Sequence, residues 1–216
     1  MSFFTAFLDL LFPKKCVFCA RVLNSSNEGW CNKCKVSLPF AENYGRQSGE
    51  IFDFCIAPLY YTDVVRHSIL RYKFRDSSYY APVYAKLLAQ CIKDCPDLNY
   101  DIISWVPLSK EREHKRGYDQ ALLLAEATAS NLDNEVTATL IKSRDAGAQS
   151  ELGDKEQRSK NISGAYTAAD PNNIKNKHVL LIDDIITTGS TLDECAKVLL
   201  DAGAQSVVCA VLARGR

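Results

Sequence analysis

The stretch that decides the fold reads Val179-Leu-Leu-Ile-Asp-Asp-Ile-Ile-Thr-Thr-Gly-Ser-Thr191. Its first four residues are apolar and predict a buried strand, which ends at two adjacent carboxylates, Asp183 and Asp184. A hydroxyl-rich turn with Gly189 follows and opens a helix predicted to run to about residue 201. Ligands of open parallel sheets bind beyond the carboxyl ends of strands, and a helix N-terminus offers unpaired N–H groups. The run therefore predicts a phosphate site.

The two carboxylates need hydroxyl groups or a cation as partners, because they stand beside a site for an anion. A ribose 5-phosphate meets both demands: its 2- and 3-hydroxyls would donate to Asp183 and Asp184, and its phosphate would lie in the turn 187–191. No GxxxxGK[ST] or GxGxxG motif competes for the role. The alternative, that paired acids only cap a solvated strand end, leaves the hydroxyl-rich turn unexplained.

The rest of the chain alternates apolar strand-like runs with helical periodicity. Continuous β-branched runs favour a parallel sheet covered on both faces, hence an α/β fold. Residues 142–160 are almost wholly polar and predict a loop. The predicted strands are 101–107, 136–141, 178–182 and 206–213, and the predicted helices are 63–74, 79–91, one from about 118, and 189–201.

A second strand end, after residues 101–107, runs into the basic segment 108–117. Because this end should share an edge of the sheet with Asp183, its lysines and arginines suit a second anionic group. A solvated turn is the alternative, and the interspersed Glu111 and Glu113 favour it for Arg112.

Cysteines punctuate the N-terminal segment as Cys16-x2-Cys19, then eleven residues, then Cys31-x2-Cys34. Four thiolates suffice for a closed tetrahedral zinc site, which would be structural because it leaves no open position. Disulfides or free core thiols are the alternative, and zinc is favoured because the segment is too small to bury a core of its own. The other cysteines lie in apolar runs and are expected in the core: Cys55, Cys91, Cys95, Cys195 and Cys209.

Basic residues surround these cysteines, with Phe18 and Trp30 interleaved. Such a mixture can bind a nucleic-acid strand by charge and stacking. Equally, the lysines can offset the negative charge of a tetrathiolate centre while the aromatics pack against a neighbour, so both interpretations stay open. The basic residues are Lys14, Lys15, Arg21, Lys33 and Lys35.

Composition sets broad limits on partners. Lysine plus arginine and aspartate plus glutamate number 26 each, so no global field draws the molecule to nucleic acid or membrane. The 216 residues, 47% of them hydrophobic, are enough for a buried core. The apolar start at residues 2–12 is too short to cross a bilayer and lacks the pattern of a signal peptide, so we expect a cytoplasmic protein without membrane insertion.

Residues 179–191 resemble the phosphoribosyl pyrophosphate (PRPP) signature of type I phosphoribosyltransferases at all thirteen positions. Together with the ribbon, VPLS at 106–109 and RGYDQA at 116–121 make the chain similar to the ComF family over nearly its whole length. Further positions fall at the family's spacing for a loop closing over PRPP: Arg144, Gln149, Leu152, Arg158, Asn161, Gly164 and Ala165. The departures are Asp119 for asparagine, Ala146 for threonine, Ala148 for proline and Ala20 for glycine.

This resemblance implies a type I phosphoribosyltransferase-like sheet flanked by helices at 49–216, preceded by an N-terminal helix and a four-cysteine zinc ribbon at 1–48. It implies structural Zn2+, and Mg2+ bound with PRPP. Asp183 and Asp184 would be the catalytic residues. The PRPP-binding residues would be Asp183, Asp184, Ile185, Ile186, Thr187, Thr188, Gly189, Ser190, Thr191, Leu108, Ser109, Lys110 and Arg158. Lys14, Lys15, Lys33, Lys35 and Arg116 would contact nucleic acid.

The implied function is PRPP binding, as a phosphoribosyltransferase or a PRPP-regulated protein, in single-stranded DNA uptake during natural transformation together with other DNA-uptake proteins. The alternative is a non-catalytic single-stranded DNA-binding protein that keeps the fold as a ligand or structural module. Acceptor specificity would lie in residues 53–80, with Arg66, Arg71, Lys73 and Arg75.

Overall fold

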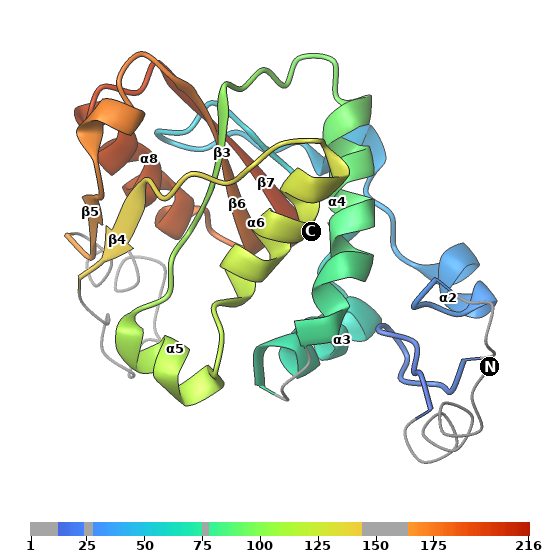
Figure 1. The fold of residues 1–216 in the computed structure, drawn as a ribbon. Coiled ribbons are helices and arrows are strands. Elements are labelled where there is room, and N and C mark those ends of the chain that lie inside the picture. Colours follow the sequence, from blue (N-terminus) through green and yellow to red (C-terminus); the bar gives the residue numbers. More distant parts are fainter. Residues whose placement is uncertain (1–12, 24–27, 75–77, 144–163) are drawn as a thin grey trace.

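A computed structural model describes residues 13–23, 28–74, 78–143 and 164–216 (Figure 1). Its main sheet has the order β1-β7-β6-β3, with β2 also paired to β7, and every one of these pairs is parallel. The predicted parallel α/β sheet is confirmed. The strands are β1 (Cys55–Ile56), β2 (Leu59–Tyr60), β3 (Ile102–Trp105), β4 (Leu140–Lys142), β5 (Tyr166–Ala168), β6 (His178–Ile186) and β7 (Ser206–Arg214).

Helices cover both faces of this sheet (Figure 1). The side chains of β6 alternate, so that Leu180 and Ile182 pack with α4 and α6, while Val179 and Leu181 pack with α8. The helices are α2 (Asn32–Ser37), α3 (Asp63–Phe74), α4 (Ala81–Asp94), α5 (Lys110–Arg116), α6 (Gln120–Asn131) and α8 (Ser190–Asp201), with short 3-10 turns η1 (Glu42–Gly45), η2 (Ser78–Tyr80) and η4 (Pro171–Asn173).

Two segments differ from the sequence-based expectation. Residues 110–116 form α5, because Ser109 caps its start and Gly117, at φ 82°, ends it. The strand predicted at 136–141 is shorter and later, as β4, which pairs with β5 outside the main sheet. The start of the predicted strand, at Val136, forms a single isolated parallel bridge with Ile103 of β3.

The N-terminal ribbon shares a core with the larger part of the chain. Val17 and Phe18 are 1% exposed and belong to the cluster that holds Tyr72 and Tyr84. The Phe18 ring lies 5.8 Å from that of Tyr84. A boundary near residue 48 stays a prediction, but burial is continuous across it.

Within the described ranges, no helix has the length and apolar content that crossing a membrane requires. The five cysteines outside the N-terminal set are buried, as expected.

Candidate functional site

The two carboxylates at the end of β6 face opposite sides of the sheet. Strand alternation directs Asp183 toward the α8 side and Asp184 toward the side of α3, α4 and α6. Asp184 is 3% exposed, and the Asp183 carboxylate accepts the backbone N–H of Asp184 at 2.8 Å. The pair therefore presents oxygens on both sides of the strand end.

Backbone geometry after β6 suits the close approach of a ligand. Gly189 has φ 85°, a left-handed conformation that side chains disfavour, and directly precedes α8. The Thr188 hydroxyl lies 3.1 Å from that of Ser190. At the first turn of α8, Asp193 accepts the backbone N–H groups of Glu50 and Ile51 at 2.9 and 2.7 Å. This contact ties the segment after the ribbon to the start of the helix.

Burial, and then the charge of Asp184, raise the pKa of Asp183 to about 8. In the unfolded chain an aspartate titrates near pH 4, at about 3.9. Between about pH 4 and pH 8 the Asp183 carboxyl is therefore protonated in the folded protein to a greater extent than in the unfolded chain. Its contribution to stability falls as pH rises through this range.

Asp183→Asn is therefore expected to stabilise the ligand-free protein most above pH 8 and least below pH 5, because it removes a carboxylate that folding penalises. Urea unfolding at pH 5, 7 and 8.5 measures the difference from wild type, with Asp201→Asn at the exposed end of α8 as control. A difference that does not change with pH would refute the assignment.

A partly buried lysine pairs with the second carboxylate. The Lys73 ammonium, from α3, lies 2.8 Å from the Asp184 carboxylate, and the two side chains are 18% and 4% exposed. Burial acts to lower the pKa of Lys73, but the charges of Asp184 and Asp183 outweigh it and raise the pKa.

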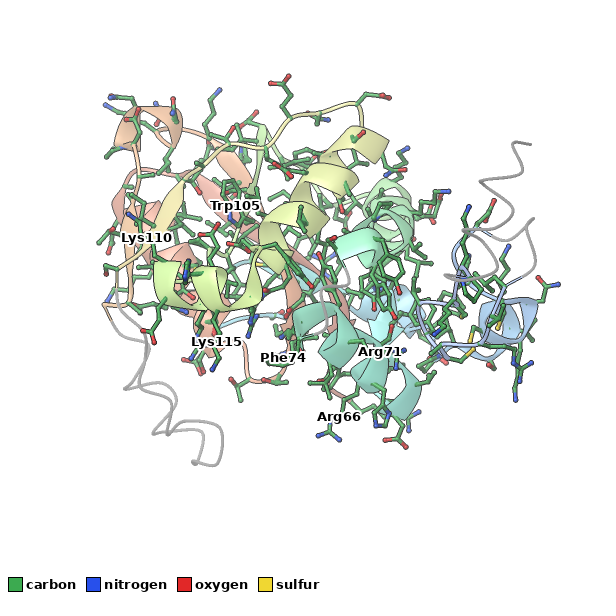
Figure 2. The ribbon with its side chains drawn as sticks, turned by 60° about the horizontal axis from the view of Figure 1, so that its bottom comes forward. Arg66, Arg71, Phe74, Trp105, Lys110 and Lys115 are labelled. Atoms are coloured by element: carbon green, nitrogen blue, oxygen red, sulfur yellow. The ribbon has the colours of Figure 1, made fainter. Side chains whose placement is uncertain are left out.

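The second strand end lies beside the first, as expected. Trp105 of β3 pairs in register with Ile182, and the N–H of Val106 donates to the Ile182 carbonyl at 3.0 Å. Ser109 is 6% exposed, and its hydroxyl accepts the Arg112 N–H at 3.3 Å, so here it caps α5. Lys110 is exposed on α5 (Figure 2).

Asp119 holds the residues that follow β3. One carboxylate oxygen accepts the N–H of Leu108 at 2.9 Å. The other caps α6, accepting from Ala121 at 2.9 Å and Leu122 at 3.2 Å. The side chain is buried, at 7% exposure, so its acceptors have little competition from water.

Asp119→Ala is expected to lower the free energy of unfolding by about 2–4 kcal/mol, since it removes a helix cap and leaves the partly buried Leu108 N–H without its acceptor. Asp119→Asn keeps one oxygen for the cap and should lose less. Urea unfolding of the three proteins measures the ranking; equal stabilities would contradict it.

Arg116 lies at this site rather than with the ribbon. Its guanidinium donates to the Gln120 side chain at 2.8 Å and sits 4.8 Å over the ring of Phe74. Phe74 is 62% exposed at the end of α3 nearest α5 (Figure 2). The nucleic-acid contact of Arg116 stays a prediction.

Four cysteine sulfurs gather in the ribbon. Those of Cys16, Cys19, Cys31 and Cys34 all lie within 4.8 Å of one another, with Cys19 and Cys31 at 3.7 Å. Zinc–sulfur bonds of about 2.3 Å in a tetrahedron put sulfurs roughly 3.8 Å apart, so the cluster fits zinc. The Cys31 N–H also points to the Cys16 sulfur at 3.4 Å.

The ribbon's basic side chains face outward. Lys14, Lys15, Lys33 and Lys35 are exposed, and Lys35 pairs with Glu28 at 3.5 Å. Trp30 instead packs on Phe18, with ring centres 5.8 Å apart. The aromatic residues thus serve packing here, while the lysines are accessible.

Several predicted site residues are brought together. Asp183 and Asp184 lie in the last part of β6, the turn to Ser190 follows that strand, and Leu108 follows the adjacent one. Arg158, Arg144 and the other residues expected in the closing loop before Gly164 lie outside the described residues, as does Arg75. The Lys73–Asp184 pair was missed, because residues so far apart in the chain carry no local sign of contact.

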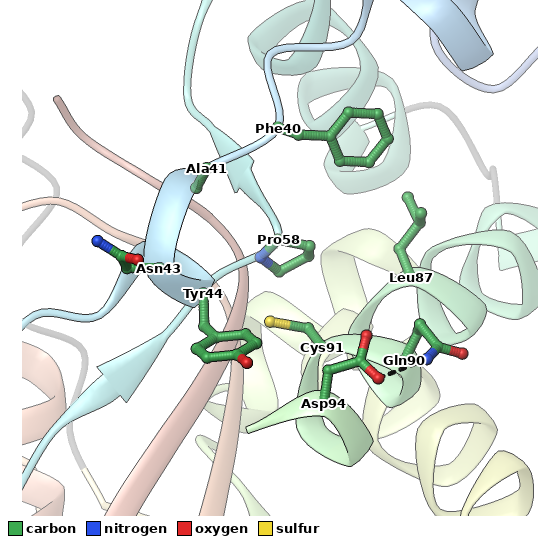
Figure 3. A pocket seen from close by; sticks show the side chains of 9 residues that line it. All are labelled: Phe40, Ala41, Asn43, Tyr44, Pro58, Leu87, Gln90, Cys91 and Asp94. Atoms are coloured by element: carbon green, nitrogen blue, oxygen red, sulfur yellow. Dashed lines mark hydrogen bonds between the residues drawn. The ribbon is translucent and has the colours of Figure 1, made fainter. Parts of the chain in front are cut away.

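A separate pocket, of about 450 Å3, lies away from these strand ends (Figure 3). It opens between the turn at η1 and helix α4, where Gln90 donates to Asp94 at 2.8 Å. No part of 106–117 or 179–191 lines it, so it does not belong to the site just described. Its lining residues are Phe40, Ala41, Asn43, Tyr44, Pro58, Leu87, Gln90, Cys91 and Asp94.

Two family models match the chain. The phosphoribosyl transferase domain matches residues 119–216, and the double zinc ribbon domain matches residues 7–56. Both matches agree with the geometry, since the first contains β6, its carboxylates and α8, and the second contains the four cysteines.

Relatives match this chain over different shares of its length. Competence protein F of Haemophilus influenzae is 28% identical over 94% of this chain and 98% of its own length. Competence protein ComFC of Bacillus subtilis is 32% identical over 66% of this chain and 56% of its own. DNA utilization protein YhgH of Escherichia coli K12 is 31% identical over 50% of this chain, which spans about half of that protein, 46%.

Solved structures give more distant likenesses. Glutamine PRPP amidotransferase from Bacillus subtilis, complexed with ADP and GMP, has a TM-score of 0.45 at 20% identity, over 65% of this chain and 30% of that one. A hypoxanthine phosphoribosyltransferase from Staphylococcus aureus has a TM-score of 0.36 at 15% identity, over 66% of this chain and 69% of that one.

The parallel sheet with its flanking helices and the cysteine ribbon define the class: a phosphoribosyltransferase-fold protein with an N-terminal zinc ribbon. Within that class, the chain belongs to the ComF/ComFC family.

Proposed function

We propose that the chain binds PRPP together with Mg2+ at the carboxyl ends of β6 and β3, and uses it as a phosphoribosyltransferase or as a regulatory ligand. The observation that carries the proposal is the end of β6, where two carboxylates precede a hydroxyl-rich turn with a left-handed Gly189 at a helix start. Carboxylates accept the hydroxyls of a ribose, and the turn receives its 5-phosphate.

The chemistry of this donor set also fits a divalent cation. Burial and then the charge of Asp184 raise the pKa of Asp183, and a bound cation or a pair of ribose hydroxyls would stabilise its charged form. Mg2+ would supply neutralisation of the pyrophosphate charge when bound. Leu108, Ser109 and Lys110 lie beyond the adjacent strand end, where a pyrophosphate group would extend from the sugar.

In the enzymatic form of the proposal, a nitrogen nucleophile bonds to the anomeric carbon while the carbon–oxygen bond to pyrophosphate breaks. Asp183 and Asp184 hold the sugar hydroxyls and so fix the position of that carbon. In this proposal Lys110 and Arg116 stabilise the charge on the departing pyrophosphate. The chain's own contribution is positioning and electrostatics.

For the biological role, we propose action on single-stranded DNA during its uptake in natural transformation, with other DNA-uptake proteins as partners. Two relatives are named competence proteins and a third a DNA utilization protein. The exposed Lys14, Lys15 and Lys33 of the ribbon supply an accessible basic surface. This surface also supports the second candidate, a non-catalytic single-stranded DNA-binding protein.

Calorimetric titration of zinc-loaded protein with PRPP and Mg2+ tests the first candidate. We expect saturable binding at one site, and weaker binding of ribose 5-phosphate, which lacks the pyrophosphate. Absence of any heat of binding, checked by a thermal-shift titration with the same ligands, would refute PRPP as the ligand.

Fluorescence anisotropy with a labelled single-stranded oligonucleotide tests the ribbon surface. Lys33→Ala should weaken binding and reduce its salt dependence, whereas Lys197→Ala, an exposed lysine on α8, should not. Identical affinities for these two variants would exclude the ribbon as the contact. Release of pyrophosphate on addition of candidate nitrogen acceptors then separates a transferase from a binding protein.

A further inference from the structure

Helix α3 contacts both the carboxylates of β6 and the four-cysteine ribbon. Its last turn carries Lys73, which pairs with Asp184 at 2.8 Å. Toward the ribbon it carries Ser68 and Arg71, which bind the peptide groups between Cys16 and Cys19. In Figure 1 the helix lies between the ribbon and α5.

The contacts with the ribbon are specific and shielded. The Ser68 hydroxyl donates to the Val17 carbonyl at 2.5 Å and lies 2.5 Å from the Tyr84 hydroxyl. Arg71 donates to the carbonyls of Val17 at 2.9 Å and Phe18 at 2.6 Å. These carbonyls belong to the turn between Cys16 and Cys19. A zinc ion bound to the two cysteines would therefore fix the positions of the two carbonyl oxygens that accept from Ser68 and Arg71.

Arg71 therefore does not reach the phosphoribosyl site, contrary to its expected place among acceptor-specifying residues. Its guanidinium also donates to the Tyr80 hydroxyl at 3.1 Å, and Figure 2 shows it on the side of α3 toward the ribbon. The residue only two positions later, Lys73, faces the carboxylates instead.

The last turn of α3 is also fixed to the second strand end. The Tyr72 hydroxyl donates to the Gln120 carbonyl at 2.6 Å, and the Tyr118 hydroxyl donates to the Tyr72 carbonyl. Tyr118 precedes Asp119, the acceptor for the Leu108 N–H. One helix thus connects the cysteine turn with both strand ends.

A ligand that gives its hydroxyls to Asp184 competes with Lys73 for the same buried carboxylate. Loss of the carboxylate partner is unfavourable for this partly buried ammonium unless another anion replaces it. A ligand carrying both vicinal hydroxyls and a pyrophosphate supplies the replacement, whereas a neutral sugar does not. The pair thereby favours ligands of the PRPP class over uncharged ribosides.

We propose that α3 couples the four-cysteine centre to the sugar-binding carboxylates, with Lys73 as the positioning residue that a phosphoribosyl ligand displaces from Asp184. The displacement of Lys73 by a ligand rests on the proposed function. The connection through α3 between the cysteine turn and the Asp184 carboxylate does not. By thermodynamic linkage, if zinc at the centre changes ligand affinity, the ligand changes zinc affinity by the same factor.

Zinc release to a chromogenic chelator measures the coupling without ligand. Arg71→Met and Lys73→Met should each release zinc at least about threefold faster than wild type. Each removes a contact that holds the last turn of α3, on the ribbon side for Arg71 and on the carboxylate side for Lys73. Arg66→Met, at an exposed arginine of the same helix, is the control and should behave as wild type. Lys73→Arg should restore the slow rate.

Circular dichroism checks that each variant is folded. A second control is Lys73→Met combined with Asp184→Asn, which removes both charges of the pair. If Lys73→Met and this double variant release zinc at the rate of Arg66→Met, the coupling is overturned. Faster release in both, with unchanged circular dichroism, supports it.

Trp30 provides the readout with ligand, because it packs on Phe18 of the cysteine turn. In a Trp105→Phe background, PRPP with Mg2+ should change Trp30 fluorescence saturably, and Lys73→Met should abolish the change while calorimetric binding persists. Calorimetric binding without any Trp30 change would overturn the coupling and leave the proposed function standing. No calorimetric binding would overturn the proposed function and Lys73 displacement, and zinc release alone would then decide the coupling.

Discussion

Replacing Asp183 and Asp184 together with asparagine is expected to weaken PRPP binding by at least about a hundredfold. Each carboxylate would accept a hydroxyl of the ribose, and a hydrogen bond to a charged group contributes about 1.5–3 kcal/mol. Loss of two such bonds amounts to about 3 kcal/mol or more, and about 1.4 kcal/mol corresponds to a factor of ten. Calorimetry at constant Mg2+ measures the change.

The matched control is Asp201→Asn, which also removes one carboxylate from this part of the chain but lies at the exposed end of α8. It should bind PRPP as wild type does. Because Asp184→Asn deprives Lys73 of its partner, the variant's fold is checked by unfolding in urea, and Lys73→Met can be added to remove the unpaired charge. Wild-type affinity in a folded double variant would refute the ribose site.

Loss of a zinc ligand should have the largest effect on stability. Cys34→Ser is expected to lose zinc and to lower the free energy of unfolding by several kcal/mol, because metal binding at a structural site is part of the folding free energy. The effect should extend beyond the ribbon, since Val17 and Phe18 are buried in one cluster with Tyr72 and Tyr84. Zinc content by atomic emission and unfolding in urea provide the measurement.

Cys91→Ala is the control for this variant, because Cys91 is a buried cysteine of α4 that does not belong to the four-cysteine group. It should retain zinc and lose only the modest free energy of a small core truncation. Chelation of wild-type protein should reproduce the Cys34→Ser behaviour. A Cys34→Ser protein with full zinc content, or with wild-type stability after zinc loss, would contradict a structural role.

Much of the fold follows from local pattern. The predicted helix 63–74 coincides with α3, and the apolar runs at 178 and 206 become β6 and β7. Helix α5 was missed because its seven residues are nearly all charged and have no apolar face for periodicity to detect. Its signal was instead in the caps, a serine before it and a glycine after it.

Asp119 shows how a residue noted from sequence acquires a physical role only in the fold. Its place before a helix indicates a cap, and two of its three accepted hydrogen bonds are of that local kind. The third, from Leu108, joins it to the end of another strand. That bond depends on the docking of α6 against β3.

What the sequence alone determined is the chemistry carried by residues close together in the chain: two pairs of cysteines, and two carboxylates followed by a hydroxyl-rich turn. Spacing suffices there, because the groups that must meet share one turn or one strand end. Only the tertiary structure decided that Lys73 pairs with Asp184 and that Arg71 binds the cysteine turn. Partners so far apart in sequence are chosen by the packing of whole helices on the sheet, and buried charges then pair with whichever group that packing brings within reach.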